Sequence, residues 1–317
     1  MMISKSINVH IYVTPVCNIR CKHCYYDAGV TEKREELLTI QQLRDIITEL
    51  DADYDADFHM EGGELFLRED INELFETIPD DILKHITITT NGTIGLSKHK
   101  NYLKKINCLR ISVCGHTDEM QKELRGIGLT KVLEVVRYAK EELLPVTLRM
   151  TLNKKYYREL LTASIQHYYE KEGIKKFSLY EFQPVGRGKE FEDEYMMDDE
   201  DCERVLQLIK DIQYRDIEIR ISFSHKRIDV VKRCEKELLA SGYEVIYLNP
   251  EESLTIDYDG MIGICPWNID KKEIGRYTGD IKKVIKAFDL HHTCEYCSVI
   301  VVQKKKGEIE GAPEINV

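Results

Sequence analysis

Hydrophobic and polar positions recur with two different periods along the first two-thirds of the chain. Apolar residues at every second position predict strands, and apolar residues three and four positions apart predict helices. A first helix is expected after Thr39, because Gln42 lies at the capping-box spacing and an apolar stripe follows. Six strands are expected, each followed by helical sequence, at residues 7–13, 58–60, 85–90, 109–113, 145–152 and 176–182.

Alternating strands and helices indicate an α/β fold with a parallel sheet covered by helices. The pattern allows a partial barrel or an open doubly wound sheet. In both architectures the functional residues collect at the C-terminal ends of the strands. The notable motifs fall at such ends: Cys17 after the first strand, Gly62-Gly63-Glu64 after the second, Asn91-Gly92 after the third, Ser112–Gly115 after the fourth and Pro184–Gly188 after the sixth.

The pattern changes after about residue 225. A helix is expected at residues 227–239, followed by a hairpin centred on Asp259-Gly260, which is a strong turn signal. A further helix is expected at residues 281–288, just before Cys294 and Cys297. We therefore predict two domains, residues 1–224 and residues 225–317.

Charge and composition narrow the functional classes. The chain has 45 basic and 56 acidic residues, a net charge of -11, so it lacks the basic surface that nucleic-acid binding usually needs. Charged residues interrupt every apolar run before it reaches the length of a membrane span. The N-terminus has no apolar core of a signal peptide. We expect a cytoplasmic protein without nucleic-acid or membrane partners.

Several of the ten cysteines are clustered near the two ends of the chain, which in a cytosolic protein indicates metal binding more than disulfides, whereas Cys108, Cys114, Cys202 and Cys234 are isolated. Cys17, Cys21 and Cys24 lie within eight residues. Three thiolates on one loop can hold three irons of a cubane and leave the fourth iron open for chemistry. The same three thiolates together with His23 or a distant histidine are also compatible with a structural zinc site.

These motifs in combination resemble the radical S-adenosylmethionine (SAM) superfamily, in which a CxxxCxxC loop follows the first strand of a partial barrel. The resemblance covers most of residues 7–190. It implies a partial (β/α)6 TIM-like barrel with a [4Fe-4S] cluster at Cys17, Cys21 and Cys24. It also implies that SAM binds the open iron and is cleaved by one electron to a 5'-deoxyadenosyl radical, which abstracts hydrogen from the substrate.

The resemblance also assigns residues to SAM binding. In the family the Gly-Gly-Glu element holds the SAM amino group, and the serine of the fourth strand contacts the ribose or carboxylate. Arg125 is a further carboxylate contact, and His23 occupies an aromatic position near the adenine. The assigned positions are His23, Gly62, Gly63, Glu64, Asn91, Ser112 and Arg125.

Two residues are candidates for a catalytic role. Relatives usually have aspartate where this chain has Cys114. Cys114 is either a small buried residue or a hydrogen-atom donor that quenches a substrate radical, as epimerisation requires. Glu181 on the sixth strand is a proton acceptor if it faces the barrel and a solvated side chain if it faces outward.

The C-terminal cysteines resemble the SPASM/Twitch extension of radical SAM enzymes. Cys265 follows the hairpin glycine, and Cys294 and Cys297 form a CxxC motif. The number of cysteines fits one auxiliary [4Fe-4S] cluster, as in the Twitch form. Its fourth ligand is Cys234, or else one iron is open; a zinc knuckle that includes His291 or His292 is the alternative.

The resemblance implies a radical SAM oxidoreductase or maturase that modifies a ribosomally made peptide by crosslinking or epimerisation. The alternatives are dehydrogenation or cofactor biosynthesis on a small molecule and, more remotely, a non-catalytic iron–sulfur or zinc protein. An electron donor such as flavodoxin or ferredoxin is expected. Only 16 residues precede Cys17, so the N-terminal module with which relatives grip a leader peptide is not expected. Either a separate leader-peptide-binding protein supplies it, the core domain binds the peptide directly, or the substrate is small.

Overall fold

A computed structural model of the chain describes residues 6–29, 37–212, 214, 216–248, 253–264, 273–286 and 298–304. Seven parallel strands lie side by side in chain order. They are β1 (Ser6–Tyr12), β2 (Asp55–Glu61), β3 (Ile86–Thr90), β4 (Cys108–Ser112), β5 (Val146–Leu152), β6 (Lys176–Glu181) and β7 (Glu218–Ser224).

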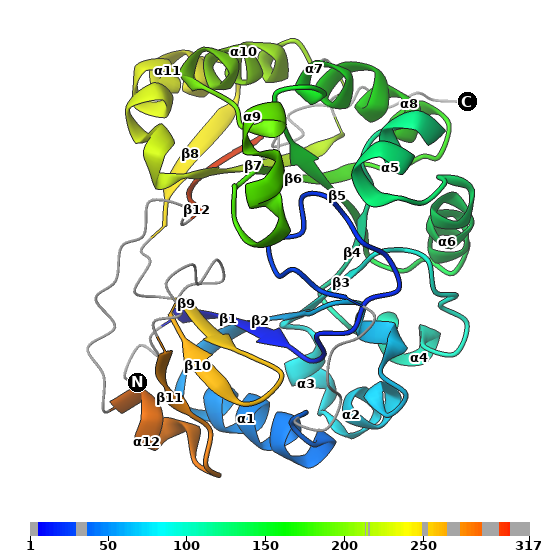
Figure 1. Cartoon of the computed structure of the whole chain (residues 1–317), viewed down its shortest axis with the longest axis vertical. Coiled ribbons are helices and arrows are strands. Elements are labelled where there is room, and N and C mark those ends of the chain that lie inside the picture. Colours follow the sequence, from blue (N-terminus) through cyan, green and yellow to red (C-terminus); the bar gives the residue numbers. More distant parts are fainter. Residues whose placement is uncertain are drawn as a thin grey trace, which may run out of the picture.

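The sheet curves around the centre of the molecule and the helices lie outside it (Figure 1). A doubly wound sheet would reverse its strand order, whereas these strands follow one another without a reversal. The structure therefore confirms the α/β class and the partial barrel.

The helices follow the expected pattern closely. Thr39 caps the first helix through its hydroxyl, 3.2 Å from the Gln42 N–H, and the Gln42 side chain accepts from the Thr39 N–H at 2.8 Å. No described helix is both long and apolar enough to cross a membrane. The helices are α1 (Ile40–Asp53), α2 (Ile71–Thr77), α3 (Asp80–Leu83), α4 (Lys100–Leu103), α5 (Asp118–Arg125), α6 (Thr130–Glu141), α7 (Tyr157–Glu159), α8 (Ile165–Glu170), α9 (Glu192–Tyr195), α10 (Asp199–Lys210), α11 (Ile228–Ala240) and α12 (Ile281–Lys286).

Each barrel strand separates an apolar face from a polar one. On β2, Phe58 and Met60 are fully buried in the main hydrophobic core, which lies between the sheet and the helices. His59 and Glu61 alternate with them and lie on the inner face of the sheet, where Glu61 lines a cavity. Because side chains alternate along a strand, an apolar outer face leaves polar residues to line the barrel interior.

One barrel strand was not expected from the sequence. Residues Glu218–Ser224 form β7 beside β6, and Ile219, Ile221 and Phe223 are buried with a period of two. Among the described residues, β1 to β7 therefore form seven consecutive parallel strands, one more than the six expected, and β9 (Ser253–Ile256) pairs parallel with β1 at the edge.

Strands beyond residue 225 extend the same sheet at both edges. The expected hairpin is confirmed: β9 (Ser253–Ile256) pairs with β1, and β10 (Met261–Gly263) returns antiparallel to β9 and then pairs with β11 (Glu273–Arg276). At the other edge β12 (Ser298–Lys304) joins β7, and β8 (Tyr243–Tyr247) joins β12. A domain boundary at residue 224 stays a prediction.

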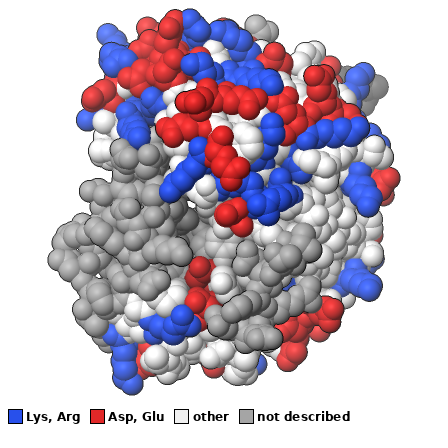
Figure 2. All heavy atoms as spheres, viewed as in Figure 1, with Lys and Arg blue, Asp and Glu red and all other residues white. Residues whose placement is uncertain are grey.

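Charged side chains of both signs alternate over α10 and α11, at the top of the view in Figure 2. Many of them are paired across or along these helices. The described pairs are Arg204 with Glu200, Lys210 with Glu237, and Arg233 with Glu203. Exposed pairs of this kind stabilise a fold only slightly, so the buried core carries the stability.

A core substitution tests this assignment. Phe58→Ala should lower the free energy of unfolding by about 3–5 kcal/mol, because it leaves a cavity between β2 and the helices. Leu143→Ala, at a side chain that is 88% exposed, should change it by less than about 0.5 kcal/mol. Urea unfolding measures both, and equal effects would contradict the proposed core.

Candidate active site

The three clustered cysteines lie on the loop that follows β1. Their side chains pack together with Ile19 and Ala28. Cys17 is buried, whereas Cys21 and Cys24 are partly exposed. Burial raises the pKa of Cys17 to about 11 and also raises the pKa of Cys24. The loop therefore gathers three thiols at the C-terminal end of the barrel.

The glycine pair after β2 lies against the backbone of the cysteine loop. The Gly63 N–H donates to the Thr14 carbonyl at 2.7 Å. A Cβ atom on Gly63 would lie 2.1 Å from the Val16 carbonyl oxygen, and one on Gly62 would lie 2.6 Å from that of Thr14. Gly62 also has a φ of +140°, which strains other residues. Only glycines allow this contact.

Arg187 holds the other side of the loop. Its guanidinium donates to the carbonyls of Cys21 at 2.9 Å and Ala28 at 2.7 Å. Its backbone N–H donates to the Cys24 carbonyl at 3.0 Å. The segment after β6 therefore fixes the positions of two of the three cysteines.

Glu64 supports the site from behind. Its buried carboxylate accepts from the Asn91 backbone N–H at 2.6 Å and from the Thr90 hydroxyl at 2.8 Å. The Asn91 side-chain amide in turn lies 3.6 Å from the Cys17 sulfur. Glu64 is not among the residues that line the cavity, so in this geometry it positions the third-strand turn and does not face a bound molecule.

Arg125 forms hydrogen bonds to the ends of two strands, beside the sulfurs of the cysteine loop. Its fully buried guanidinium donates to the carbonyls of Ser112 and Asn91, the latter at 2.8 Å. Burial lowers its pKa, but the sulfurs of Cys21 and Cys114 outweigh burial and raise it. Arg125 therefore stays charged and supplies positive charge next to the cysteine loop.

These elements enclose a cavity of about 140 Å³ between the cysteine loop and the strand ends. The structure brings most of the expected site residues to its wall. Those that line it are Cys17, Cys21, His23, Cys24, Gly62, Gly63, Asn91, Ser112, Cys114, Arg125 and Glu181.

Several buried polar atoms at this cavity have no hydrogen-bond partner within the described residues. They are Nδ1 of His23 and both side-chain amide atoms of Gln183. Burial, together with the charge of Arg125, lowers the pKa of His23 to about 3, so the ring is neutral. Buried polar groups are normally satisfied, and these atoms are free to bind a polar molecule.

Cys114 lies at the cavity wall next to His23. Its sulfur is 3.9 Å from His23 Nε2, and the residue is 2% exposed. Burial raises the pKa of Cys114 to about 12, so the group is a thiol at neutral pH. A buried packing residue and a hydrogen-atom donor both agree with this position, and the donor role stays a prediction.

The deeper wall holds a charged group that the sequence interpretation missed. Arg149 lies 3.4 Å from the Glu61 carboxylate and 4.4 Å above the Tyr180 ring, while the Tyr25 hydroxyl donates to Glu61 at 2.5 Å. Although burial opposes it, Arg149 holds the pKa of Glu61 well below its usual range. The signal was the single charged residue of the fifth strand, whose other residues are apolar or threonine.

Glu181 lines the cavity, but its carboxylate is bound by residues at the end of β7 and just after it. Its carboxylate lies 2.7 Å from Arg227 Nε and accepts from the backbone N–H and the hydroxyl of Ser224, both at 2.9 Å. One oxygen is thus engaged in a buried ion pair with Arg227, and the other accepts both hydrogen bonds from Ser224. These partners indicate a structural role for Glu181, and its role as a proton acceptor stays a prediction.

Cys234 is remote from this cavity. It lies on the buried face of α11, which packs against α10, and it belongs to the main hydrophobic core. The other expected ligands of an auxiliary cluster, Cys265, Cys294 and Cys297, lie outside the described residues. The ligand set of that cluster stays a prediction.

Comparison with known proteins finds one family and several relatives. Residues 11–163 match the model of the radical SAM superfamily. A probable GTP 3',8-cyclase of Sulfurisphaera tokodaii is 27% identical over 273 residues, 84% of this chain and 82% of the relative. GTP 3',8-cyclase of Alkaliphilus oremlandii is 28% identical over 214 residues, 65% of this chain and 66% of the relative.

A solved structure shares the fold. SuiB of Streptococcus suis, bound to its precursor peptide SuiA, superposes with a TM-score of 0.69 at 15% identity. The match covers 89% of this chain and 64% of SuiB, so the chain spans less than two thirds of SuiB. At this identity the likeness is one of fold.

The glycine contact is testable through metal content. Gly63→Ala should lower the iron content of anaerobically reconstituted protein several-fold, because its Cβ would displace the loop that carries Cys17. Gly95→Ala is the matched control, since a Cβ there meets nothing within 4 Å. Wild-type iron content in Gly63→Ala would contradict the loop geometry.

The ion pair of Glu181 predicts a loss of stability. Glu181→Gln should lower the free energy of unfolding by about 3 kcal/mol, because Arg227 is left buried with less compensation. The exposed Glu190→Gln should have almost no effect. Urea unfolding distinguishes the two variants; an unchanged midpoint in Glu181→Gln would refute the structural role of this carboxylate.

Proposed function

The chain belongs to the radical SAM superfamily, and on this premise we propose that it cleaves SAM reductively to abstract a hydrogen atom from a small-molecule substrate. The observation that carries the proposal is the single cavity at the strand ends. It gathers the three cysteines of the loop with the glycine pair, Asn91 and Ser112. A site for electron transfer alone would need no such pocket beside its cysteines.

The residues present fit the cluster that the superfamily implies. Cys17, Cys21 and Cys24 would hold three irons, and the fourth would supply the one-electron chemistry of SAM cleavage. The Asn91 amide, 3.6 Å from the Cys17 sulfur, is a donor to a metal-bound thiolate. Arg125 beside Cys21 offsets the negative charge of the thiolates.

The same cavity offers polar partners for SAM. The amino and carboxylate groups of SAM need acceptors and donors, and the unpartnered amide of Gln183 and Nδ1 of His23 supply both. Arg125 brings a positive charge close to Ser112 at the fourth strand end. On these contacts we propose that SAM binds between the cysteine loop and the barrel wall.

A small substrate is favoured over a peptide. The relatives that match along most of this chain are named GTP 3',8-cyclase, and the likeness to the peptide-bound SuiB is one of fold. The barrel wall below the cavity presents Arg149, Glu61 and the Tyr180 ring, which suit a polar aromatic molecule. We therefore propose a cofactor-biosynthesis reaction of the cyclase type, with a purine nucleotide as the first candidate substrate.

A second cluster belongs to this proposal. Cys265, Cys294 and Cys297 would hold it, with flavodoxin or ferredoxin as the electron donor to the enzyme. Because Cys234 lies between α10 and α11 in the core, we favour an auxiliary cluster with one iron open to substrate. Close to eight irons per reconstituted chain would support two clusters, and four irons plus one zinc would support a zinc knuckle.

SAM cleavage tests the proposed reaction. Dithionite-reduced, reconstituted protein should form 5'-deoxyadenosine from SAM, and Cys21→Ala should abolish it because the cluster loses a ligand. Cys108→Ala is the matched control, since Cys108 lies at the other end of the barrel. Its thiol donates a hydrogen bond to the Thr147 hydroxyl at 3.2 Å. No 5'-deoxyadenosine from fully iron-loaded protein would refute the reaction.

Substrate class is tested in the same assay. GTP is expected to increase 5'-deoxyadenosine formation and to yield a new nucleotide product, detected by mass spectrometry. Stimulation by a precursor peptide but not by nucleotides would overturn the small-molecule assignment while leaving SAM cleavage intact.

A further inference from the structure

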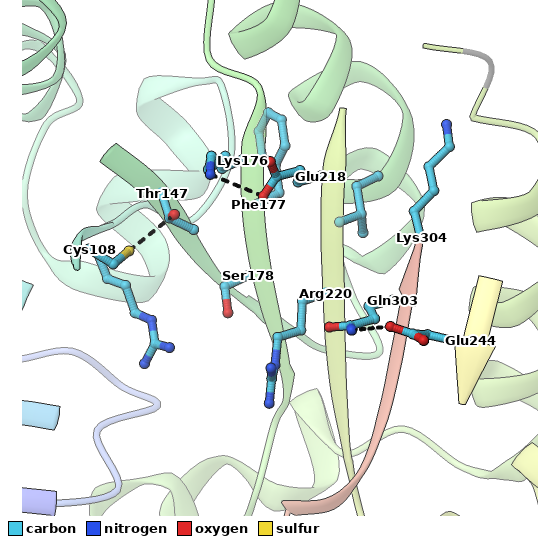
Figure 3. Close-up of a pocket in the computed structure, with 12 residues that line it drawn as sticks. Cys108, Thr147, Lys176, Phe177, Ser178, Glu218, Arg220, Glu244, Gln303 and Lys304 are labelled. Carbon is cyan, nitrogen blue, oxygen red and sulfur yellow. Dashed lines mark hydrogen bonds and ion pairs between the residues drawn. The ribbon is translucent and has the colours of Figure 1, made fainter. Parts of the chain in front are cut away.

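The barrel has a second cavity at the end opposite the cysteine loop. It encloses about 530 Å³ at the N-terminal ends of β4 to β7 (Figure 3). That volume lies within the range of small-molecule sites. Functional residues of such barrels are expected at the other end, so this cavity needs its own explanation.

The strand register sorts its lining residues into two layers. Lys176 lies beside Glu218 at the mouth, and two residues further along the same strands Ser178 lies beside Arg220. In Figure 3 Ser178 and Arg220 point the same way from neighbouring strands. Arg110, on β4, lines the same space. The deeper layer therefore presents two guanidinium groups and a hydroxyl.

The carboxylates of the cavity do not neutralise these arginines. Glu218 pairs with Lys176 at 3.1 Å, and Glu244 accepts a hydrogen bond from a neighbouring glutamine. Within the described residues, neither Arg110 nor Arg220 has an ion pair within 4 Å. The cavity is cationic at its deeper layer although the chain carries a net charge of -11.

The two arginines also have hydrogen-bond donors to spare. Nη1 of Arg110 lies 3.3 Å from Nδ1 of His59, a ring that burial keeps neutral by lowering its pKa well below the usual range. The backbone of Arg220 pairs with β6 and β12, but its guanidinium makes no hydrogen bond within the described part of the chain. A guanidinium has five N–H donors, so most of those on this pair are available.

The positive charges of Arg110 and Arg220 repel each other. Partial burial lowers the pKa of Arg220, and the charge of Arg110 lowers it further, against the opposing effects of Tyr180 and Asp57. Asp57 lies 3.9 Å from His85, its only ion-pair partner among the described residues. Arg220 is exposed and Arg110 half-buried, so water screens part of their repulsion in the free protein, and an anion bound between them would remove the rest.

Ser178 supplies a third contact. The residue is 3% exposed, and its hydroxyl makes no hydrogen bond of ordinary geometry within the described residues, although Tyr180 lies near it on the same strand. Buried hydroxyl groups are normally satisfied. A ligand at the depth of Arg220 would satisfy this one.

From this juxtaposition we propose that the cavity binds a small metabolite through a phosphate group, held by Arg110, Arg220 and the Ser178 hydroxyl. Arginine matches phosphate oxygens with paired N–H donors, and a tetrahedral phosphate can receive donors from several strands at once. The Lys176–Glu218 pair lies at the mouth, above the bound group. This site is separate from the proposed SAM chemistry and lies at the other end of the barrel.

Calorimetric titration of the reconstituted protein with inorganic pyrophosphate tests the proposal. Saturable binding is expected, and Arg220→Gln should weaken it roughly tenfold or more, because a charge-assisted hydrogen bond is lost. The matched control is Arg204→Gln, which removes an exposed guanidinium paired with Glu200 and should bind as wild type does. Citrate, a carboxylate of similar charge, should bind more weakly than pyrophosphate.

Thermal unfolding separates binding from folding. Without ligand, Arg220→Gln should keep or raise the melting temperature, because it removes a like-charge repulsion. A lower melting temperature would indicate a structural arginine and overturn the proposal. Absent pyrophosphate binding, tighter binding of citrate, or binding lost in Arg149→Gln and kept in Arg220→Gln would overturn it as well.

Discussion

The site depends on the backbone contact between the Gly62-Gly63 turn and the segment that leaves β1. With 2.1 Å between an added Cβ on Gly63 and the Val16 carbonyl oxygen, no side chain fits. The contact fixes the cysteine loop over the strand ends, where Asn91 reaches Cys17 and Arg187 reaches the carbonyl of Cys21. Three elements far apart in sequence are thereby held around one cavity.

The alternation of side chains along each strand makes the barrel interior polar, and this interior is accessible at both ends of the barrel. The apolar side chains of each strand pack against the helices, so their neighbours must face the interior. At the C-terminal end Glu61 is paired with Arg149, and Arg125 is bound by two backbone carbonyls. At the N-terminal end neither Arg110 nor Arg220 forms an ion pair with a carboxylate among the described residues. That cavity can therefore accept an anion.

Much of this was predictable from the sequence, because local patterns determine it. The Thr39–Gln42 capping box, the hairpin before β10 and the position of Cys17 after a strand all follow from short-range spacing. The role of Glu181 did not follow, because its partner Arg227 lies 46 residues away in the sequence. The sequence also does not determine which face of its strand a single carboxylate occupies. Non-local contacts likewise decide that Glu64 faces the third strand.

The proposed function requires the cavity beside the cysteine loop to bind SAM next to an iron–sulfur cluster held by that loop. Electron paramagnetic resonance of the reduced, reconstituted protein with and without SAM tests it most directly. A [4Fe-4S] signal that changes on adding SAM, and that Cys21→Ala removes, is the predicted result. Zinc in place of iron at Cys17, Cys21 and Cys24, or a cluster signal that SAM leaves unchanged, would contradict the account.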